Sequence, residues 1–196
     1  GSSGVELVRD SKKSIKLLKK KERLSLKRKA ISFLRKIKLT KEQFLIYQYN
    51  KKKFNGFVVQ EFISDLSFDY KVLIFWHKFF VLKRNIKSGD FRASGSGLFE
   101  FEKPSDAVLE YAMNIFSTLD TPYASLDIAV SESGCKLIEF QALNFGPYTL
   151  INSPGYYQIK DSEWYFTEEK SSLEQEFSRS LAAFIQEKYM TRQKLK

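Results

Sequence analysis

The chain has 196 residues, of which 43% are hydrophobic, and its 18 phenylalanines and 10 tyrosines exclude a disordered protein. It is long enough for one well-filled core or for two small lobes that share a cleft. A single cysteine, Cys135, excludes an internal disulfide framework, and because the chain has only one histidine a cysteine-based zinc site is excluded as well. The sequence contains no apolar run long enough to span a membrane and no signal-peptide pattern, so we expect a cytoplasmic protein without a membrane span.

The net charge of +10 is unevenly distributed along the chain. Most of the excess lies in residues 12–53, in lysine clusters such as 19–21 and 51–53. This segment predicts an anionic partner, such as nucleotide phosphates, an acidic peptide or protein, nucleic acid or an anionic membrane surface. A solvated helix surface explains the same charges equally well.

The first third of the chain begins with Gly1-Ser2-Ser3-Gly4. These residues form either a glycine-rich turn that enters a short strand over residues 5–8 or the remainder of an expression tag. Residues 11–39 place hydrophobic side chains at roughly helical intervals among lysines, which predicts one broken helix or two short ones. The apolar run at 57–63 predicts a strand.

Two β-hairpins are predicted from runs of β-branched and aromatic residues. In chain order their strands and turns are 69–75, 76–78 and 79–84, and then 125–130, 132–134 and 135–142.

Two helices are predicted from apolar residues that recur at intervals of three and four. The first runs from Ser105, which is placed to cap it, to Leu119. The second runs from about Ser171 to Lys188, and Ser171 and Glu174 have the spacing of a capping box.

The strongest local signal lies in the second predicted hairpin. With a loop of three residues, Asp127 lies directly opposite Glu139, and strand alternation puts Gln141 on the same face. Opposed carboxylates repel, so a cation is expected between them, and two carboxylates with an amide oxygen suit magnesium. A loop that differs by one residue would instead put the carboxylates on opposite faces, and both interpretations stay open at this point.

Two arginines occupy positions from which a cation can reach a nucleotide phosphate. Arg84 ends a predicted strand, and Arg92 lies in the flexible glycine- and serine-rich loop 88–97. Basic groups beside metal ligands favour phosphoryl chemistry, in which the protein positions the phosphates and neutralises their charge. For each arginine alone, a surface ion pair is the commoner fate.

The order of these motifs resembles the ATP-grasp superfamily, especially the ligases that add glutamate to peptides, of the ribosomal-protein glutamate ligase type. Glutathione synthetase and D-alanine–D-alanine ligase are more distantly similar. The motifs that carry the resemblance are Gln60-Glu61-Phe62-Ile63, Asp69-Tyr70-Lys71, Arg84, Gly89-Asp90-Phe91-Arg92, Leu126-Asp127-Ile128 and Ile138-Glu139-Phe140-Gln141.

The resemblance runs from residue 1 to about 147 and implies an α+β ATP-grasp fold, with two lobes of mostly antiparallel sheets flanked by helices. Its N-terminal part is expected to be truncated. The implied domains are a partial nucleotide-binding lobe over 1–64, a C-terminal ATP-grasp lobe with the metal site over 65–150, and an aromatic loop with a closing helix over 151–196.

The resemblance also implies an active site for ATP and magnesium, with manganese as an alternative metal. The implied metal ligands are Asp127, Glu139 and Gln141, although the family usually has Asn at the third position. Arg92 would stabilise the acyl phosphate and the transferring phosphoryl group. The implied nucleotide-binding residues are Gly1, Ser2, Ser3 and Gly4 at the phosphates, Glu61 and Ile63 at the adenine, and Asp69, Lys71 and Arg84 nearby.

Three features qualify this implied site. Lys71 stands where the family commonly has Arg, so a bidentate contact would be lost there. The family's phosphate-binding lysines precede the glycine-rich loop, and the sequence begins after them. Asn144 follows the metal strand where the family contacts substrate and would orient a carboxylate, with a simple turn as the alternative.

The leading functional hypothesis is an ATP-dependent ligase that joins a small-molecule or peptide carboxylate to an amine through an acyl phosphate. One alternative is a non-catalytic module whose basic segment 12–53 binds nucleic acid or an anionic surface. Another is a degenerate ATP-grasp relative that keeps the fold as an interaction surface.

Overall fold

The computed structural model describes Leu7, Thr40, Lys41, Gln43 and the ranges 60–64, 66–87 and 96–194. The chain forms two compact units, one of which comprises residues 63–196 while the other ends at Phe62. In the unit that ends at Phe62, the Thr40 hydroxyl accepts a hydrogen bond from the backbone of Gln43 at 3.3 Å, and the Gln43 side chain accepts one from the backbone of Thr40 at 3.1 Å. This reciprocal pair is a capping box at the start of a helix.

Several predicted features lie outside the described residues. They are the turn at 1–4, most of the strand at 5–8, nearly all of the basic segment 12–53, the first part of the strand at 57–63, and the loop that carries Arg92. These stay predictions.

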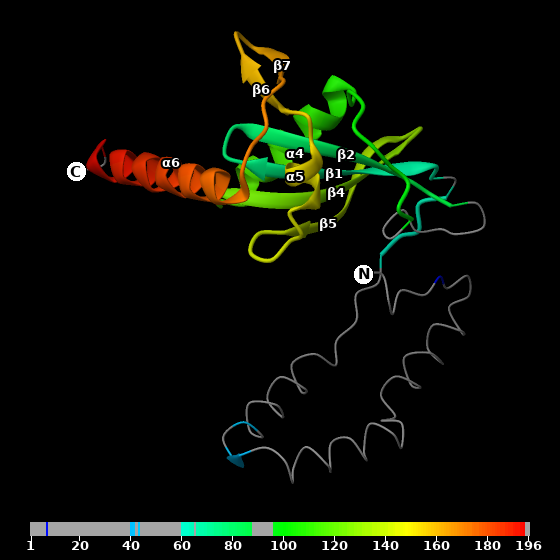
Figure 1. Ribbon diagram of the computed structural model, residues 1–196, viewed down its shortest axis with the longest axis horizontal. Coiled ribbons are helices and arrows are strands. Elements are labelled where there is room, and N and C mark those ends of the chain that lie inside the picture. Colours follow the sequence, from blue (N-terminus) through cyan, green and yellow to red (C-terminus); the bar gives the residue numbers. More distant parts are fainter. Residues whose placement is uncertain are drawn as a thin grey trace. The chain divides into compact units, whose positions relative to one another are not determined.

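The described part of the unit 63–196 contains one seven-stranded antiparallel sheet and three helices (Figure 1). The strands are β1 (Phe68–Phe75), β2 (Lys78–Asn85), β3 (Phe99–Glu100), β4 (Tyr123–Ser131), β5 (Gly134–Gln141), β6 (Tyr156–Lys160) and β7 (Glu163–Thr167), and the helices are α4 (Asp106–Thr118), α5 (Tyr148–Asn152) and α6 (Leu173–Lys194). The strand order is β5-β4-β1-β2-β6-β7, and β3 pairs with β2. An α+β fold with an antiparallel sheet is thereby confirmed.

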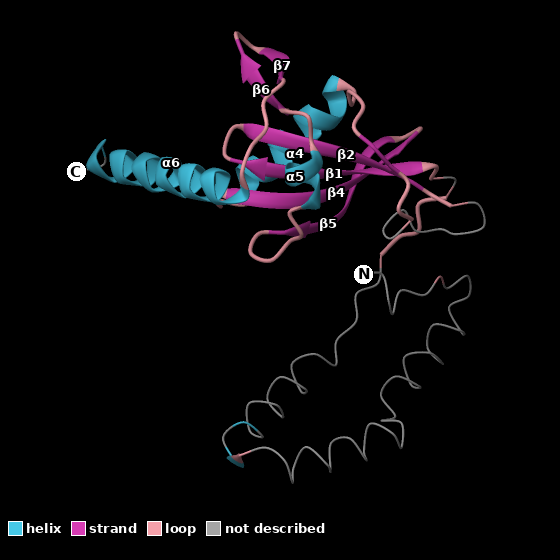
Figure 2. Ribbon diagram, in the orientation of Figure 1, coloured by secondary structure: helices cyan, strands magenta, loops and turns pink. Residues whose placement is uncertain are grey.

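One face of the sheet is covered by α4 (Figures 1 and 2). Val72 and Ile74 of β1 point to this face and pack with Val108, Leu109 and Ala112 of the helix, and all five side chains are at most 1% exposed. Burying a Val, Leu or Ile side chain stabilises a fold by about 1.5–3 kcal/mol, so this apolar layer contributes strongly to holding α4 against the sheet.

The opposite face changes from aromatic to charged along β1. At one end Phe75 contacts Phe177 of α6 with 5.1 Å between ring centroids, and Tyr123 lies 4.6 Å from the same ring. At the other end, on the same face by strand alternation, β1 carries Asp69 and Lys71. In the described structure, α6 packs against the aromatic half of this face. Asp69 and Lys71 lie at the other end of β1, away from these aromatic contacts.

A buried carboxylate fastens α6 to the β1–β2 hairpin. Glu176 is 1% exposed and accepts hydrogen bonds from Lys78 Nζ at 2.8 Å and from Arg179 Nε at 2.9 Å. The Arg179 guanidinium also donates to the carbonyl oxygen of Phe75 at 2.7 Å. Burial opposes the charged form of Glu176, but the hydrogen bonds from the two cations outweigh it and lower its pKa.

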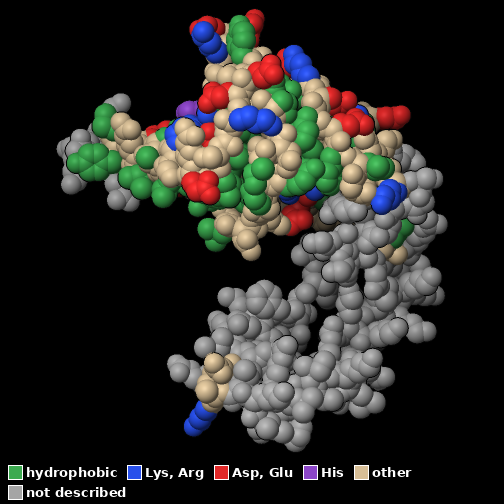
Figure 3. All heavy atoms as spheres, viewed as in Figure 1, with side chains coloured by type: hydrophobic (Ala, Val, Ile, Leu, Met, Phe, Trp, Pro, Cys, Tyr) green, Lys and Arg blue, Asp and Glu red, His purple; other side chains and the backbone are tan. Residues whose placement is uncertain are grey.

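Beyond this anchor, α6 projects past the sheet (Figure 1). Leu181 and Ile185 are 46% and 57% exposed, and Figure 3 shows hydrophobic side chains on the surface of this projecting part. No helix in the part of the chain that the structure describes is long and apolar enough to cross a membrane.

Both hairpin turns are one residue shorter than predicted. Lys78 belongs to β2 rather than to the turn, which consists of Trp76-His77 with a left-handed φ of 60° at Trp76. Gly134 likewise belongs to β5, with φ of 102°, and the turn is Glu132-Ser133. A left-handed residue in or beside a two-residue turn lets the turn follow the twist of the strands, so no third residue is needed.

The predicted helix caps are confirmed in part. Ser105 is the N-cap residue of α4, as predicted, although its hydroxyl makes no capping hydrogen bond to the described residues. At α6 the Ser172 hydroxyl accepts a hydrogen bond from the backbone of Gln175 at 3.3 Å, whereas the Ser171 hydroxyl is buried without a hydrogen-bond partner in the part of the chain that the structure describes. The helix therefore begins one residue later than the capping-box spacing indicates, and it continues to Lys194.

The segment expected as an aromatic loop contains the hairpin β6–β7. Its turn residues, Asp161 and Ser162, have φ of 52° and 67°, which is typical of a type I′ turn. Just before the hairpin, a Cβ atom on Gly155 would lie 2.0 Å from the carbonyl oxygen of Thr167. Only glycine allows the two backbones to approach this closely.

The predicted strand at 57–63 is wrong in its described part. Residues 60–63 form no strand and are not part of the described sheet. Phe62 is 49% exposed, so the apolar run does not mark a buried strand here.

Candidate functional site: a charged cluster on the sheet

Four charged side chains meet on the face of the sheet that α4 does not cover. Asp69 and Lys71 come from β1, Arg84 from β2 and Asp127 from β4. The register pairs Asp69 with Arg84 and Lys71 with Asp127, which brings all four to one face. The sequence predicted all four as site residues.

Arg84 is the centre of this cluster. Its Nε and Nη2 atoms donate to the two carboxylate oxygens of Asp69 at 2.6 and 2.7 Å, and Nη2 also lies 2.8 Å from Asp127 Oδ2. Lys71 Nζ donates to Asp127 Oδ1 at 3.0 Å. Both oxygens of Asp127 are therefore paired with a cation.

The four side chains differ in how far solvent reaches them. Asp69 and Arg84 side chains are only 4% and 8% exposed, whereas those of Asp127 and Lys71 are 12% and 19% exposed. The bidentate geometry between Asp69 and Arg84 is the strongest form of ion pair that proteins use. Asp69 and Arg84, the inner pair, are thus held in a fixed geometry, whereas Asp127 and Lys71, the outer pair, lie at the solvent-exposed edge of the cluster.

Burial acts on the ionisation of the inner pair. It raises the pKa of Asp69, in the same direction as the charge of Asp127, while the hydrogen bonds and charge of Arg84 oppose the shift. For Arg84, burial disfavours the charged form, but the hydrogen bonds and charges of Asp69 and Asp127 outweigh burial and raise its pKa. Arg84 is therefore a permanent cation shared by two carboxylates.

Glu139 lies directly opposite Asp127 on β5, as predicted, but by a different route. The hairpin turn is one residue shorter than the prediction required, which alone would have moved Glu139 out of register. A β-bulge restores it, because Ile128 pairs with Leu137 and Ile138 is the extra residue.

Gln141 lies beside Glu139 at this edge of the sheet. Its side-chain Nε2 donates to Glu139 Oε1 at 2.6 Å, and Glu139 is exposed. Ser125, which the sequence analysis missed, is the register partner of Gln141 and is 2% exposed. Its spacing of two from Asp127 on one strand was the available signal.

The donor set of Asp127, Glu139 and Gln141 fits a hard divalent cation in chemistry. Two carboxylates and an amide oxygen are the ligands that Mg²⁺ and Mn²⁺ prefer. The set holds only two carboxylates, and among the described residues no three His, Cys, Asp or Glu side chains form a group suited to a metal. Glu139 is open to solvent, while Asp127 would have to exchange one of its two cationic partners.

Of the remaining predicted site residues, Ile63 and Asn144 make no hydrogen bond or ion pair with this cluster among the described residues. Glu61 is exposed and Ile63 half-buried in a segment without regular structure, and Asn144 is exposed in the loop after β5. The neighbour of Asn144, Phe145, stacks on Phe177 with 6.0 Å between ring centroids, so the aromatic core holds this loop in place. Arg92 lies outside the described residues.

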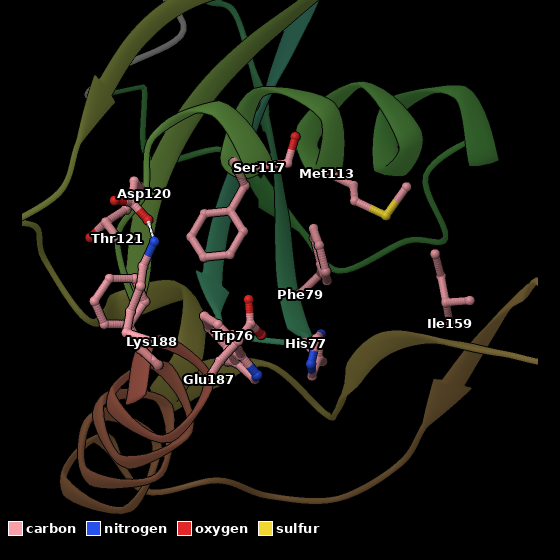
Figure 4. A pocket seen from close by; sticks show the side chains of 12 residues that line it. Trp76, His77, Phe79, Met113, Ser117, Asp120, Thr121, Ile159, Glu187 and Lys188 are labelled. Carbon is pink, nitrogen blue, oxygen red and sulfur yellow. Dashed lines mark ion pairs between the residues drawn. The ribbon is translucent and has the colours of Figure 1, made fainter. Parts of the chain in front are cut away.

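A pocket of about 370 Å³ lies at the other end of the β1–β2 hairpin (Figure 4). Aromatic side chains such as Trp76 and Phe79 line it, and an ion pair between Asp120 and Lys188 crosses its rim. Trp76 follows the last residue of β1 while Asp69 is near the first, so an extended strand of roughly 20 Å separates the pocket from the charged cluster. The pocket contains none of the predicted site residues.

Comparison with known proteins adds no assignment to this geometry. No family model matches the chain, and no curated protein matches its sequence.

Proposed function

We propose that this chain supplies the magnesium-binding and phosphoryl-stabilising wall of an ATP-dependent carboxylate–amine ligase of the ATP-grasp kind. The observation that carries the proposal is the direct opposition of Asp127 and Glu139 on one sheet face, with Gln141 next along the strand. Opposed carboxylates destabilise a sheet unless cations compensate, and here a structural cation, Arg84, already lies against one of them. Acidic and basic groups gathered in this way suit phosphate chemistry.

Different residues of the cluster would bind the metal and position its ligands. A bound Mg²⁺ at Asp127, Glu139 and Gln141 would neutralise charge on the phosphate oxygens. Asp69 holds Arg84, and Arg84 in turn fixes the orientation of Asp127, so the carboxylate is positioned before any ligand arrives.

The reaction class comes from the resemblance of the motifs. The γ-phosphoryl group of ATP passes to a substrate carboxylate, giving an acyl phosphate and ADP. The amine then attacks the acyl carbon, phosphate leaves, and the amine loses a proton to give an amide. The proposed substrates are a small-molecule or peptide carboxylate and an amine, and we expect Asn144, which is exposed in the loop after β5, to contact one of them.

One observation favours a second candidate, a degenerate ATP-grasp domain that serves as an interaction surface. Lys71 and Arg84 occupy both oxygens of Asp127, so the cluster is charge-compensated without a metal. A protein that had lost its metal would be expected to keep such internal ion pairs.

Calorimetry with Mn²⁺ and ADP separates the two candidates. The ligase proposal expects Mn²⁺-dependent binding of ADP that weakens at least about tenfold in Glu139→Gln, since losing even an outer contact of a metal site costs 10–100-fold. Glu139 is exposed, so this variant should fold normally, and Glu110→Gln on the exposed surface of α4 is the matched control. ADP binding that ignores Mn²⁺ and the Glu139 change would refute the metal assignment. No binding of Mn²⁺ at all would favour the interaction domain.

A further inference from the structure

The ion pair between Lys71 and Asp127 occupies a position that a metal ion would need. Lys71 Nζ lies 3.0 Å from Asp127 Oδ1, while Arg84 holds Oδ2 at 2.8 Å. We propose that Lys71 is a positioning residue that acts as a built-in cation: it holds Asp127 in place when no metal is bound and leaves Oδ1 when the metal binds. The inference rests on the proposed function and adds an exchange step that the resemblance does not imply.

Of the two cations on Asp127, Lys71 is the one able to leave. Arg84 makes two further hydrogen bonds to Asp69, at 2.6 and 2.7 Å, and its side chain is 8% exposed. Among the described residues, Asp127 is the one carboxylate that the Lys71 side chain contacts; this side chain is 19% exposed, and its stem is flexible. Exchange at Oδ1 therefore breaks one ion pair and leaves the bidentate pair intact.

The direction of exchange follows from the position of Glu139. Glu139 is opposite Asp127 on β5, whereas Lys71 is opposite Asp127 on the other side, on β1. A divalent cation at Asp127 would gain a second carboxylate ligand from Glu139. Among the described residues, Lys71 contacts Asp127 and makes no ion pair with Glu139. Lys71 and a divalent cation on one oxygen would repel each other strongly, so the two are expected to be alternatives.

The test measures the affinity of Mn²⁺ for the whole chain, by electron paramagnetic resonance of free Mn²⁺ and by the Mn²⁺-induced rise in melting temperature. Lys71→Met keeps the apolar stem and removes the charge, so Mn²⁺ should bind about fivefold tighter, because the metal no longer has to break one ion pair. Lys71→Arg, which keeps the charge, should show no gain. A lysine too far from the metal to compete with it for Asp127 would not raise metal affinity when removed.

Lys83→Met is the matched control. Lys83 also pairs with a carboxylate, Glu102, at 2.8 Å, and its side chain is 16% exposed, close to the value for Lys71. It stands opposite Tyr70 and so points to the face that α4 covers. At 0.15 M salt, where charges more than about 8 Å apart are screened, its removal should leave Mn²⁺ affinity unchanged.

The outcomes distinguish failure of the inference from failure of the proposed function. Tighter Mn²⁺ binding in Lys71→Met alone supports both. Equal Mn²⁺ binding in the unmodified chain and in Lys71→Met, or an equal gain in Lys83→Met, overturns the exchange and leaves the metal site standing. Absence of Mn²⁺ binding from the unmodified chain and from Lys71→Met, with and without ADP, overturns the metal site and the exchange together.

Discussion

The carboxylate of Glu176 should contribute strongly to the stability of the fold, and Glu176→Gln measures how much. The amide keeps the shape of the side chain but leaves Lys78 and Arg179 without their counter-charge. Removing one partner of a buried ion pair costs about 3–5 kcal/mol. Because the Arg179 side chain is 34% exposed, solvent weakens its ion pair with Glu176. The Lys78 side chain is only 14% exposed, so its ion pair with Glu176 is screened less. We expect a loss of about 3 kcal/mol at pH 7.

The same loss should depend on pH in a defined direction. The pKa of Glu176 is lowered in the folded chain relative to its ordinary value of 4.5. A group whose folded pKa is depressed contributes its full stability above the unfolded pKa and loses it as the pH falls through the folded pKa. The difference between the unmodified chain and Glu176→Gln should therefore be constant from pH 7 to about 5.5 and shrink below about pH 4.5.

Urea unfolding followed by circular dichroism at several pH values measures both effects. Glu174→Gln is the control, because Glu174 is exposed in the first turn of the same helix, where the interaction of its charge with the helix dipole is worth about 0.3–1 kcal/mol. A difference below about 1 kcal/mol for Glu176→Gln at pH 7, or one that grows on acidification, would contradict the reasoning from burial.

Two further substitutions test other parts of the fold. Arg84→Met should lower the free energy of unfolding by about 3–5 kcal/mol in urea, because two poorly exposed carboxylates lose their shared cation; adding Asp69→Leu should restore part of that loss, and no restoration would mean that the pair is not coupled. Gly155→Ala should lower the melting temperature by several degrees, because the new Cβ atom would lie 2.0 Å from the carbonyl oxygen of Thr167. A shift in melting temperature of less than about two degrees would show that the two segments separate easily.

The sequence predicted the two central hairpins, the two long helices and the shared face of Asp127 and Glu139, because these depend on alternation and apolar spacing. The exact register did not follow from the pattern. The shorter turn and the bulge at Ile138 are two errors of one residue that cancel, and neither leaves a mark in hydrophobic periodicity.

The hairpin β6–β7 was missed for a related reason. Its type I′ turn is made by Asp161 and Ser162 instead of the Asn-Gly or Asp-Gly sequences that normally announce such a turn. β3 has two residues, too few for any alternation. The short strand β3 therefore depends on its pairing with β2, and the hairpin β6–β7 depends on a turn whose sequence is unusual for its type.

The sequence identified the basic residues of the candidate site but did not predict which carboxylates they pair with. Arg84 and Lys71 were expected beside nucleotide phosphates, which stays a prediction, and the structure pairs both with carboxylates from other strands. Such partners are distant in sequence, since Lys71 and Asp127 are 56 residues apart. Only the strand order, which places β1 between β2 and β4, brings them together.

The two cations on Asp127 are therefore expected to separate into different roles, and stability and metal affinity measured on the same variants can show it. Arg84 is buried and makes three contacts to two carboxylates, so its loss should unfold the cluster. Lys71 makes one contact at the rim, where its side chain is 19% exposed, and an ion pair that solvent reaches in this way is worth only about 1 kcal/mol. If Lys71→Met cost as much stability as Arg84→Met, Lys71 would be part of the support for the sheet, and an exchange with a metal ion would require disrupting the fold. A small cost in stability together with a gain in Mn²⁺ affinity is the combination that a displaceable cation requires.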